Sequence, residues 1–370
     1  MAVTVATSTV NIPMGDQRQR QIFFALGLHW LFYYEAAGWI YRTSSDGLSW
    51  SDKILVGAGS TVGSRSLVYD ESSDSIHTLT SGGTTGWYKR GDLSSDGTIT
   101  WSAVQNIAMD DIYYSMIAID SDGYPWIGCN NLVLAVNHPT VNKSSTKDGT
   151  WTTDAGFPYE LSAIIVGAFT YAYIVPLTGG KVYALYGTAG AKIYGKLYSA
   201  GAWGAEEVVS SSTTQGAFIT ASNYQDTVKV AFTSSSNARI YYVERDASGT
   251  WSTETEIFSE GVGDAQGVPQ LCVDQDNGVV YVIWAYDGSV YIMRKIGDVL
   301  DPCYAWITGE GLFPFGTGAG ANMKTFVNIP PKKYGRYIGV GWGAGSASPY
   351  NVRFTSITIL PVNIKNSKSL

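Results

Sequence analysis

The chain has 370 residues, of which 45% are hydrophobic, 13% aromatic and only 15% charged. A disordered chain or a coiled coil would carry more charge and fewer aromatic residues, so this composition excludes both. The net charge is −7 and the 24 Lys and Arg residues are scattered. Because proteins that bind nucleic acid use a basic patch to displace counterions, we expect no nucleic-acid partner.

The sequence gives no sign of a membrane segment or a metal site. Residues 1–13 lack the basic start and the apolar run of a secretory signal, and no apolar stretch reaches the roughly 20 residues of a spanning helix. Cys129, Cys272 and Cys303 show no metal-binding spacing, so we interpret them as small buried residues. We therefore expect neither membrane insertion nor a metal nor any cofactor.

A tryptophan recurs along the chain at a nearly constant spacing. The repeated positions are 50, 101, 151, 203, 251 and 306, with spacings of 51, 50, 52, 48 and 55. A polar turn precedes most of them, and short runs rich in Val, Ile, Tyr and Phe lie upstream, such as 40–44, 240–245 and 290–295. Alternation with period two, broken by Gly, Asp, Asn and Ser, predicts β-strands throughout.

One repeat can be divided completely into strands. Residues 268–274, 279–285 and 289–295 predict three strands, and a fourth begins at Trp306. Four antiparallel strands in each repeat of about 50 residues are typical of a β-propeller, whose blades cover one another's faces. The length of 370 residues corresponds to seven such repeats. The predicted fold class is therefore all-β, a seven-bladed β-propeller.

The two ends of the chain are predicted to close the ring. Residues 323–329, 336–342 and 350–359 give only three strands of a last blade, and residues 4–13 resemble an outer strand. We therefore predict one domain over residues 1–370, in which strand 4–13 completes the last blade. The alternative is a six-bladed ring followed by a small C-terminal β-unit at 310–370.

Two of the turns resemble a known repeat. The segments SSDGLSW (44–50) and SSDGTITW (94–101) resemble the Asp-box of sialidase-like (BNR-repeat) propellers, although Gly47 and Gly97 directly follow the aspartates, one residue earlier than usual. The resemblance implies a propeller in which this turn joins the third and fourth strands and has a structural role. The Phe-Arg-Ile-Pro motif of sialidases is absent, which argues against sialidase activity.

Arginines recur near the ends of the third strands. They are Arg42, Arg90, Arg245 and Arg294. Side chains placed identically in several blades cannot converge on one ligand, so we interpret these arginines as exposed outer charges that span neighbouring strands.

The candidate ligand-binding residues come from the loops that enter the inner strands, since these loops differ between blades. They are Asp16, Arg18, Arg65, Asp110, Tyr113, Tyr159, Glu160, Gln215, Asp264 and Gln266, with Asp111 and Asn322 nearby. Aromatic rings beside carboxylates and amides suit sugars. Trp39 and Trp87 begin third strands and could stack on a ligand, although packing between blades is the simpler explanation for both.

We consider three functions. The first is a non-enzymatic surface or tail component of a virion or phage that binds host glycans or surface proteins and contacts other virion subunits, which would place it on a virion surface or outside the cell. The second is a sialidase-like glycoside hydrolase or lyase that uses carboxylates such as Asp110, Glu160 and Asp264. The third is a scaffold that contacts neighbouring subunits. Fold alone does not give function. Among these three functions we favour the first, and we assign no catalytic residue.

Overall fold

The structure is a computed structural model, and the ranges that it describes are separated by short gaps. They are residues 2–10, 13–15, 19–58, 64–81, 85–107, 109, 112–133, 136–151, 154–163, 172–187, 192–210, 214–234, 239–259, 268–286, 289–301, 304–307, 327–344 and 348–359. Strands and turns make up these ranges, without a helix among them.

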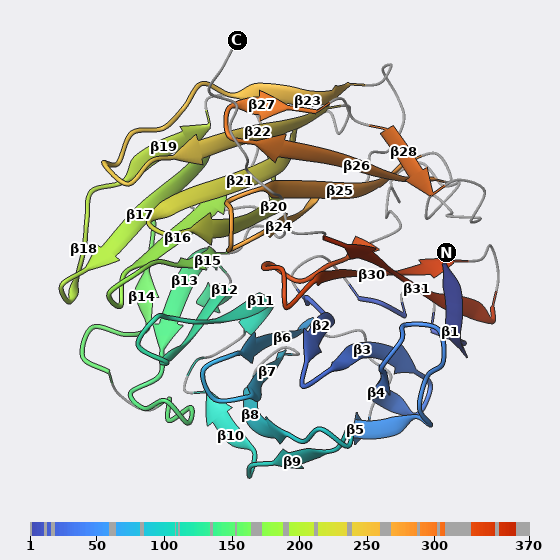
Figure 1. Cartoon of the computed structure of the whole chain (residues 1–370). Helices are drawn as coiled ribbons and strands as arrows, with labels where there is room; N and C mark the ends of the chain where they lie inside the picture. Colours follow the sequence, from blue (N-terminus) through green and yellow to red (C-terminus); the bar gives the residue numbers. More distant parts are fainter. Residues whose placement is uncertain are drawn as a thin grey trace.

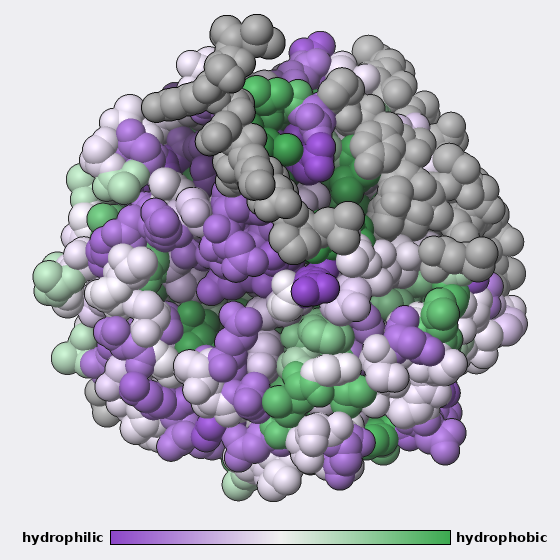
Figure 2. All heavy atoms as spheres, viewed as in Figure 1, coloured by the Kyte–Doolittle hydropathy of each residue, from purple (hydrophilic) through white to green (hydrophobic). Residues whose placement is uncertain are grey.

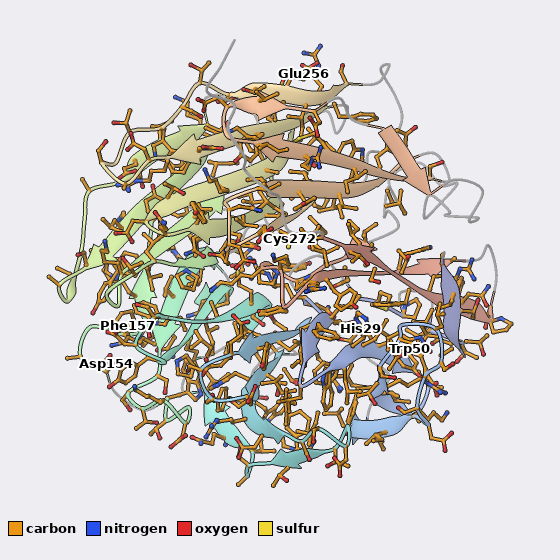
Figure 3. All side chains as sticks on the ribbon, viewed as in Figure 1. His29, Trp50, Asp154, Phe157, Glu256 and Cys272 are labelled. Atoms are coloured by element: carbon orange, nitrogen blue, oxygen red, sulfur yellow. The ribbon has the colours of Figure 1, made fainter. Side chains whose placement is uncertain are left out.

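Seven antiparallel sheets surround a central axis and form a seven-bladed β-propeller (Figure 1). The predicted fold class and blade number are confirmed, and the six-bladed alternative is wrong. Figure 2 shows hydrophilic and hydrophobic residues interspersed over the described part of the same face. In each blade the strands follow one another from the axis outward. Figure 3 shows this order: Cys272, on an inner strand, lies near the middle of the ring, and Glu256, on an outer strand, lies at its edge.

The blades are numbered in chain order. Blade 1 contains β2 (Ile22–Ala25), β3 (Leu28–Glu35), β4 (Gly38–Ser44) and β5 (Ile54–Ala58). Blade 2 contains β6 (Ser64–Asp70), β7 (Ser75–Ser81), β8 (Gly86–Leu93), β9 (Ile99–Trp101) and β10 (Gln105–Ile107). Blade 3 contains β11 (Ile112–Ile119), β12 (Pro125–Val133), β13 (Val136–Lys143) and β14 (Tyr159–Glu160). Blade 4 contains β15 (Ala172–Pro176), β16 (Val182–Gly187), β17 (Ile193–Ser199), β18 (Ala202–Trp203) and β19 (Glu207–Ser210).

The second half of the ring follows the same plan. Blade 5 contains β20 (Thr214–Tyr224), β21 (Thr227–Ser234), β22 (Arg239–Arg245) and β23 (Thr255–Ser259). Blade 6 contains β24 (Gln270–Val273), β25 (Val280–Tyr286), β26 (Ser289–Ile296), β27 (Val299–Leu300) and β28 (Tyr304–Ile307). Blade 7 contains β29 (Val327–Asn328), β30 (Tyr337–Ala344), β31 (Tyr350–Thr358) and, from the other end of the chain, β1 (Val3–Ser8).

The N-terminal strand is the outer strand of blade 7. β1 pairs antiparallel with β31, with Val3 opposite Phe354 and Ser8 opposite Tyr350, and the two strands lie side by side in Figure 1. Ser8 Oγ also donates a 2.7 Å hydrogen bond to the carbonyl oxygen of Tyr34 in blade 1. The first residues of the chain therefore join the last blade to the first.

The repeated tryptophans pack against the preceding blade. Trp151 meets Tyr88 of blade 2 edge-on at 5.5 Å between ring centroids, and Trp251 meets Tyr183 of blade 4 at 5.7 Å. Trp50 reaches Phe354 of blade 7 in the same way. All five repeated indoles from Trp50 to Trp251 are buried or half-buried, as expected for side chains that pack between blades. For Trp306 the structure describes the backbone only.

The turn before each of these tryptophans contains a glycine with positive φ. These glycines are Gly47, Gly97, Gly149, Gly201, Gly249 and Gly297. At Gly47 the turn is held by Asp46, whose Oδ1 accepts 2.8 Å hydrogen bonds from the N–H groups of Leu48 and Ser49. This turn joins β4 to β5, the third and fourth strands of the blade, as the resemblance to the Asp-box implies.

Hydrogen bonds also connect successive inner strands around the axis. Ser66 Oγ accepts a 3.1 Å hydrogen bond from the N–H of Ile117, and Thr220 Oγ1 accepts one of the same length from Leu271. At the closure of the ring, Asn328 Oδ1 accepts from the N–H of Gln21 at 3.0 Å. Side chains of the inner strands therefore fix the blades to one another near the axis.

Candidate functional site

The candidate residues were chosen from one face of the propeller, which we call the loop face. It is the end of the ring at which the chain enters the inner strands and at which the second and third strands are joined. Asp16, Arg18, Asp110, Asp264 and Gln266, together with Asp111 and Asn322, lie outside the described residues. The structure describes Tyr113 in β11 and Gln215 in β20 by their backbone only. Arg65, Tyr159 and Glu160 are described completely.

Arg65 begins the inner strand of blade 2 and extends toward blade 1. Its guanidinium carbon lies 5.7 Å from the ring centroids of both Tyr34 and Trp39, which belong to blade 1. The side chain is buried, and burial lowers the pKa of the guanidinium, while Tyr34 acts in the opposite direction. Arginine nevertheless remains a cation in proteins, so Arg65 brings a positive charge beneath the loop face.

Tyr159 takes part in packing between blades 3 and 4. Its ring stacks on Trp203 with centroids 5.1 Å apart and planes at 18°, and the ammonium of Lys196 lies 5.8 Å from the ring centroid. The ring is thus occupied by neighbours of the same chain, and a contact of Tyr159 with a ligand remains a prediction.

Glu160 lies against His138, a residue with which no sequence motif connects it. The side chains meet with His138 Nδ1 2.9 Å from Glu160 Oε1. Both residues lie on the side of the blade 3 sheet that faces blade 2. Glu160 pairs with Thr140, and Thr140 pairs with Cys129, which packs against residues of blade 2. His138 pairs with Asn131, two residues after Cys129 and therefore on the same side of the sheet. Both are near the loop face, since β13 begins there.

The histidine–carboxylate pair is partly accessible to solvent. The side chain of Glu160 is 45% exposed and that of His138 is 15% exposed, whereas Nδ1 itself is buried. The Nδ1–Oε1 distance suits a hydrogen bond, but its angles are outside the ideal range. Such contacts in free enzymes often align only when substrate is bound. A carboxylate that orients one nitrogen of an imidazole leaves the other nitrogen to exchange a proton.

The pairing of residues 138 and 160 could not be deduced from sequence. Twenty-two positions separate them, and their contact depends on the register of β13 against β14. A sequence signal would have required the correct start of both strands to within one residue, because a shift of one residue moves a side chain to the other face of the sheet.

The two tryptophans that were considered as ligand contacts behave differently. Trp39 is 2% exposed and packs on Phe32 with centroids 4.9 Å apart, as expected for packing within the core. Trp87 is 39% exposed, so packing between blades does not explain its position. An exposed indole near the loop face is a surface on which a sugar ring could stack.

A polar cluster at the axis was also missed. Arg20 is buried with a φ of 47°, and its Nη2 donates to the hydroxyl of Tyr173 and, at 2.9 Å, to the carbonyl oxygen of Ala221. Tyr173 belongs to blade 4 and Ala221 to blade 5, on the far side of the axis from blade 1. The arrangement spans the centre of the ring, and all three partners are buried, so it holds the ring rather than presenting a group to solvent.

The described residues contain no group of three or more His, Cys, Asp or Glu side chains that could hold a metal ion. Cys129 and Cys272 are buried with free thiols, and burial raises the pKa of both thiols. Cys303 lies outside the described residues. Across the described ranges there is also no helix long and apolar enough to cross a membrane.

The repeated arginines connect blades more than the sequence suggests. Arg90 contacts Asp148 of blade 3 at 3.0 Å, and Arg245 binds Glu207 of blade 4 at 2.8 Å. Arg294 stays within its own blade, next to Asp301. The interpretation as exposed outer charges is therefore wrong for Arg245, whose side chain is 7% exposed and sits between two blades.

No protein-family model matches the sequence, and neither does any curated protein. Solved structures match in fold. A polysaccharide lyase of family PL25, an ulvan lyase bound to -[GlcA(1-4)Rha3S]-, is 9% identical with a TM-score of 0.63, over 97% of this chain and 96% of that one. The polysaccharide lyase Uly1 is 11% identical with a TM-score of 0.60, over 94% and 90%. The SapL1 lectin, in complex with alpha methyl fucoside, is 10% identical with a TM-score of 0.53, over 81% and 97%.

These similarities correct the first functional hypothesis. The prediction of a virion or phage surface component is wrong: the three solved structures described above are two polysaccharide lyases and a lectin, and none of these three is a virion component. At this level of identity the similarity itself establishes the fold.

Proposed function

We propose that this protein is a polysaccharide lyase that cleaves a uronate-containing glycan at the loop face of the propeller. The observation that carries the proposal is the contact between His138 and Glu160 on that face. The match in fold to two polysaccharide lyases over more than nine-tenths of this chain supports it.

The reaction requires a base near a weakly acidic carbon. In a lyase the base removes the proton from the carbon beside the uronate carboxylate. The bond from the neighbouring carbon to the glycosidic oxygen then breaks, a carbon–carbon double bond forms, and the departing oxygen takes up a proton. With Glu160 holding Nδ1, His138 Nε2 would accept the carbon-bound proton. Cations stabilise the negative charge that develops on the carboxylate.

The partner of Glu160 favours this chemistry over glycoside hydrolysis. Most glycosidases use two carboxyl groups on either side of the bond that breaks. In the part of the chain that the structure describes, Glu160 contacts an imidazole. The carboxylates Asp110 and Asp264, with which it was grouped, lie outside the described residues.

The decisive experiment measures double-bond formation. The protein is incubated with uronate-containing polysaccharides, and the ultraviolet absorbance of the unsaturated uronate end is followed. His138→Asn is expected to reduce the rate by about a hundredfold or more, since positioned acid–base groups contribute 10²–10⁴-fold. Glu256→Gln, on the outer strand of blade 5, is the matched control and should leave the rate unchanged. Absence of the unsaturated product with all uronate polysaccharides would contradict the lyase.

A sugar-binding protein without turnover is the second candidate. The exposed Trp87 favours it, and so does the fold of the SapL1 lectin. Binding of an intact glycan to the unmodified protein, with no product after prolonged incubation, would establish this function in place of the lyase. In either case the partner is a glycan, and we propose that the protein works outside the cell, where such polysaccharides occur.

Two features of organisation remain proposals. We propose that residues 1–370 form one domain, because β1 completes the sheet of β29, β30 and β31. We also propose that the repeats are related to the Asp-box type. In support, Asp246 Oδ1 accepts a 2.8 Å hydrogen bond from the N–H of Thr250 in the turn of blade 5. In the turn of blade 1, Asp46 Oδ1 accepts a hydrogen bond of the same length from the N–H of Ser49.

A further inference from the structure

One row of side chains crosses the blade 2 sheet next to the loop face. In register across four strands, Arg65 of β6 pairs with Thr80 of β7, Thr80 with Trp87 of β8, and Trp87 with Asn106 of β10. Directly paired residues project from the same side of a sheet, so the four side chains form one line from the inner to the outer strand.

This row faces blade 1. Leu67 and Tyr69, two and four residues after Arg65 on the same strand, pack into the hydrophobic cluster of blade 1 that includes Trp30 and Phe32. Alternation along β6 therefore directs Arg65 to the same side, and its contacts with Tyr34 and Trp39 agree.

Blade 1 presents a complementary row. Tyr34 pairs with Trp39, and Trp39 pairs with Gly57 on the outer strand β5. An added Cβ at Gly57 would lie 3.9 Å from Arg65 Nη1, so the guanidinium extends outward to the place where blade 1 lacks a side chain. We call these seven residues of the two rows the blade 1–2 seam.

The seam contains one buried polar atom without a hydrogen-bond partner, and it contains an exposed ring. Trp39 Nε1 is buried and has no hydrogen-bond partner, in a side chain that is 2% exposed. An unsatisfied buried donor costs free energy, which a ligand acceptor would recover. Trp87 is 39% exposed and Asn106 is exposed, so the outer half of the seam is open to solvent.

The chemistry of the seam specifies its ligand. The Trp87 indole offers a face for the apolar side of a sugar ring. Thr80 and Asn106, on either side of it in the row, offer a hydroxyl and an amide for sugar hydroxyls. Arg65 supplies a planar cation that matches the oxygens of a carboxylate. We propose that the blade 1–2 seam is a binding subsite for an acidic sugar residue of a polysaccharide chain.

The seam is separate from the proposed catalytic pair, and the two are adjacent in the ring. The seam lies between blades 1 and 2, whereas His138 and Glu160 face blade 2 from blade 3. A glycan lying over the loop face of blade 2 would touch both. The inference rests on the glycan class of the proposed function, but it does not require that the glycan is cleaved.

Binding to a matched pair of probes tests the subsite. The probes are a uronate-containing tetrasaccharide and the same tetrasaccharide with its carboxyl groups reduced to alcohols. Affinities are measured by calorimetry in His138→Asn protein, which should keep the acidic probe intact. Trp87→Ala in this background is expected to weaken binding of both probes by about tenfold, and Trp87→Phe is expected to retain most of it.

The control and the second variant separate stacking from charge. Leu48→Ala is the matched control, because Leu48 is 61% exposed on the turn between β4 and β5, at the opposite end of blade 1. It should bind as the parent does. Arg65→Gln is expected to remove the preference for the acidic over the reduced probe, with its thermal midpoint measured alongside to show that the ring is intact.

The outcomes distinguish the subsite from the lyase. If Trp87→Ala binds both probes as tightly as Leu48→Ala does, the subsite is wrong, and a normal rate of cleavage would leave the lyase standing. If Trp87→Ala loses affinity while unmodified protein cleaves no glycan, the subsite stands and the lyase is wrong. Equal losses for the two probes in folded Arg65→Gln would overturn the assignment of an acidic sugar.

Discussion

Arg245 of blade 5 and Glu207 of blade 4 form a two-point ion pair. Arg245 Nε and Nη2 each donate a 2.8 Å hydrogen bond to a different oxygen of the Glu207 carboxylate. Trp251 Nε1 and the Tyr183 hydroxyl also donate to Glu207, at 2.8 and 2.9 Å. Burial raises the pKa of Glu207, but the hydrogen bonds from these three residues together lower it. One carboxylate therefore joins two blades through four hydrogen bonds.

Neutralising this carboxylate should destabilise the ring. Glu207→Gln leaves the Arg245 charge, which is 7% exposed, without its counterion, at an expected cost of about 3 kcal/mol. The matched control is Glu256→Gln, which breaks an ion pair to Arg239 in which both side chains are more than one-third exposed, and which should change stability by less than about 1 kcal/mol. Urea denaturation measures both. Similar midpoints for the two variants would show that the Glu207 pair does not hold the blades together.

The turn glycines predict a second contrast. Gly149 and Gly201 occupy the same turn in blades 3 and 4, with φ values of 93° and 81°. A Cβ at Gly149 would lie 1.8 Å from the Tyr88 ring, whereas at Gly201 it would meet nothing within 4 Å. Both Ala variants carry the strain of positive φ, about 1 kcal/mol. Only Gly149→Ala should lose a further amount of stability, about 1–3 kcal/mol, because the Tyr88 ring must move. Equal thermal midpoints would contradict this packing.

The period of the tryptophans was sufficient to predict the fold. Each indole fills the space against the preceding blade, as Trp151 does against Tyr88, so their spacing equals the spacing of the blades. The same regularity appears in the turn glycines from Gly47 to Gly297. Such contacts are repeated in every blade and leave a periodic trace in the sequence.

The candidate site left no such trace. His138 meets Glu160 within blade 3, and Arg65 meets Trp39 of the neighbouring blade. These contacts depend on strand register and on which side of a sheet faces which neighbour, and neither quantity has a period of 50 residues. Arg65 and Glu160 could be selected from sequence because the loops that enter the inner strands differ between blades, and Trp87 because it begins a third strand, but the partners of these residues could not.

Closure of the ring predicts the effect of a deletion. Removing residues 1–13 takes away β1. The edge of β31 is then exposed, and the hydrogen bond from Ser8 to blade 1 is lost. We expect a lower thermal midpoint and concentration-dependent aggregation of the shortened protein. A synthetic peptide of residues 1–13 should raise the midpoint again by adding a strand to the free edge. If the deletion leaves the midpoint unchanged, β1 does not close the ring.

Two buried histidines make stability depend on pH. His77 is 1% exposed, with Nδ1 2.6 Å from the Tyr88 hydroxyl, and burial lowers the pKa of His77 from 6.5 to about 4. Burial also lowers the pKa of His29 to about 4. Above pH 6.5 both imidazoles are neutral in the folded and the unfolded chain, so they add no pH dependence there. As the pH falls from 6.5 toward 4, the unfolded chain binds protons that the folded chain does not, and the free energy of unfolding decreases by about 1.4 kcal/mol per pH unit for each histidine.

Replacing one of the two histidines should remove half of this dependence. In His77→Gln only His29 still titrates in this range, so the slope of unfolding free energy against pH between 6.5 and 4 is expected to be about 1.4 kcal/mol per unit smaller than in the unmodified protein. Urea denaturation at half-unit intervals of pH measures both slopes. The carboxylates that titrate near the lower end are the same in the two proteins, so their contribution cancels in the difference. Parallel slopes would mean that His77 binds its proton as readily in the ring as in the unfolded chain, and that the Tyr88 side of the blade 2–3 interface admits water.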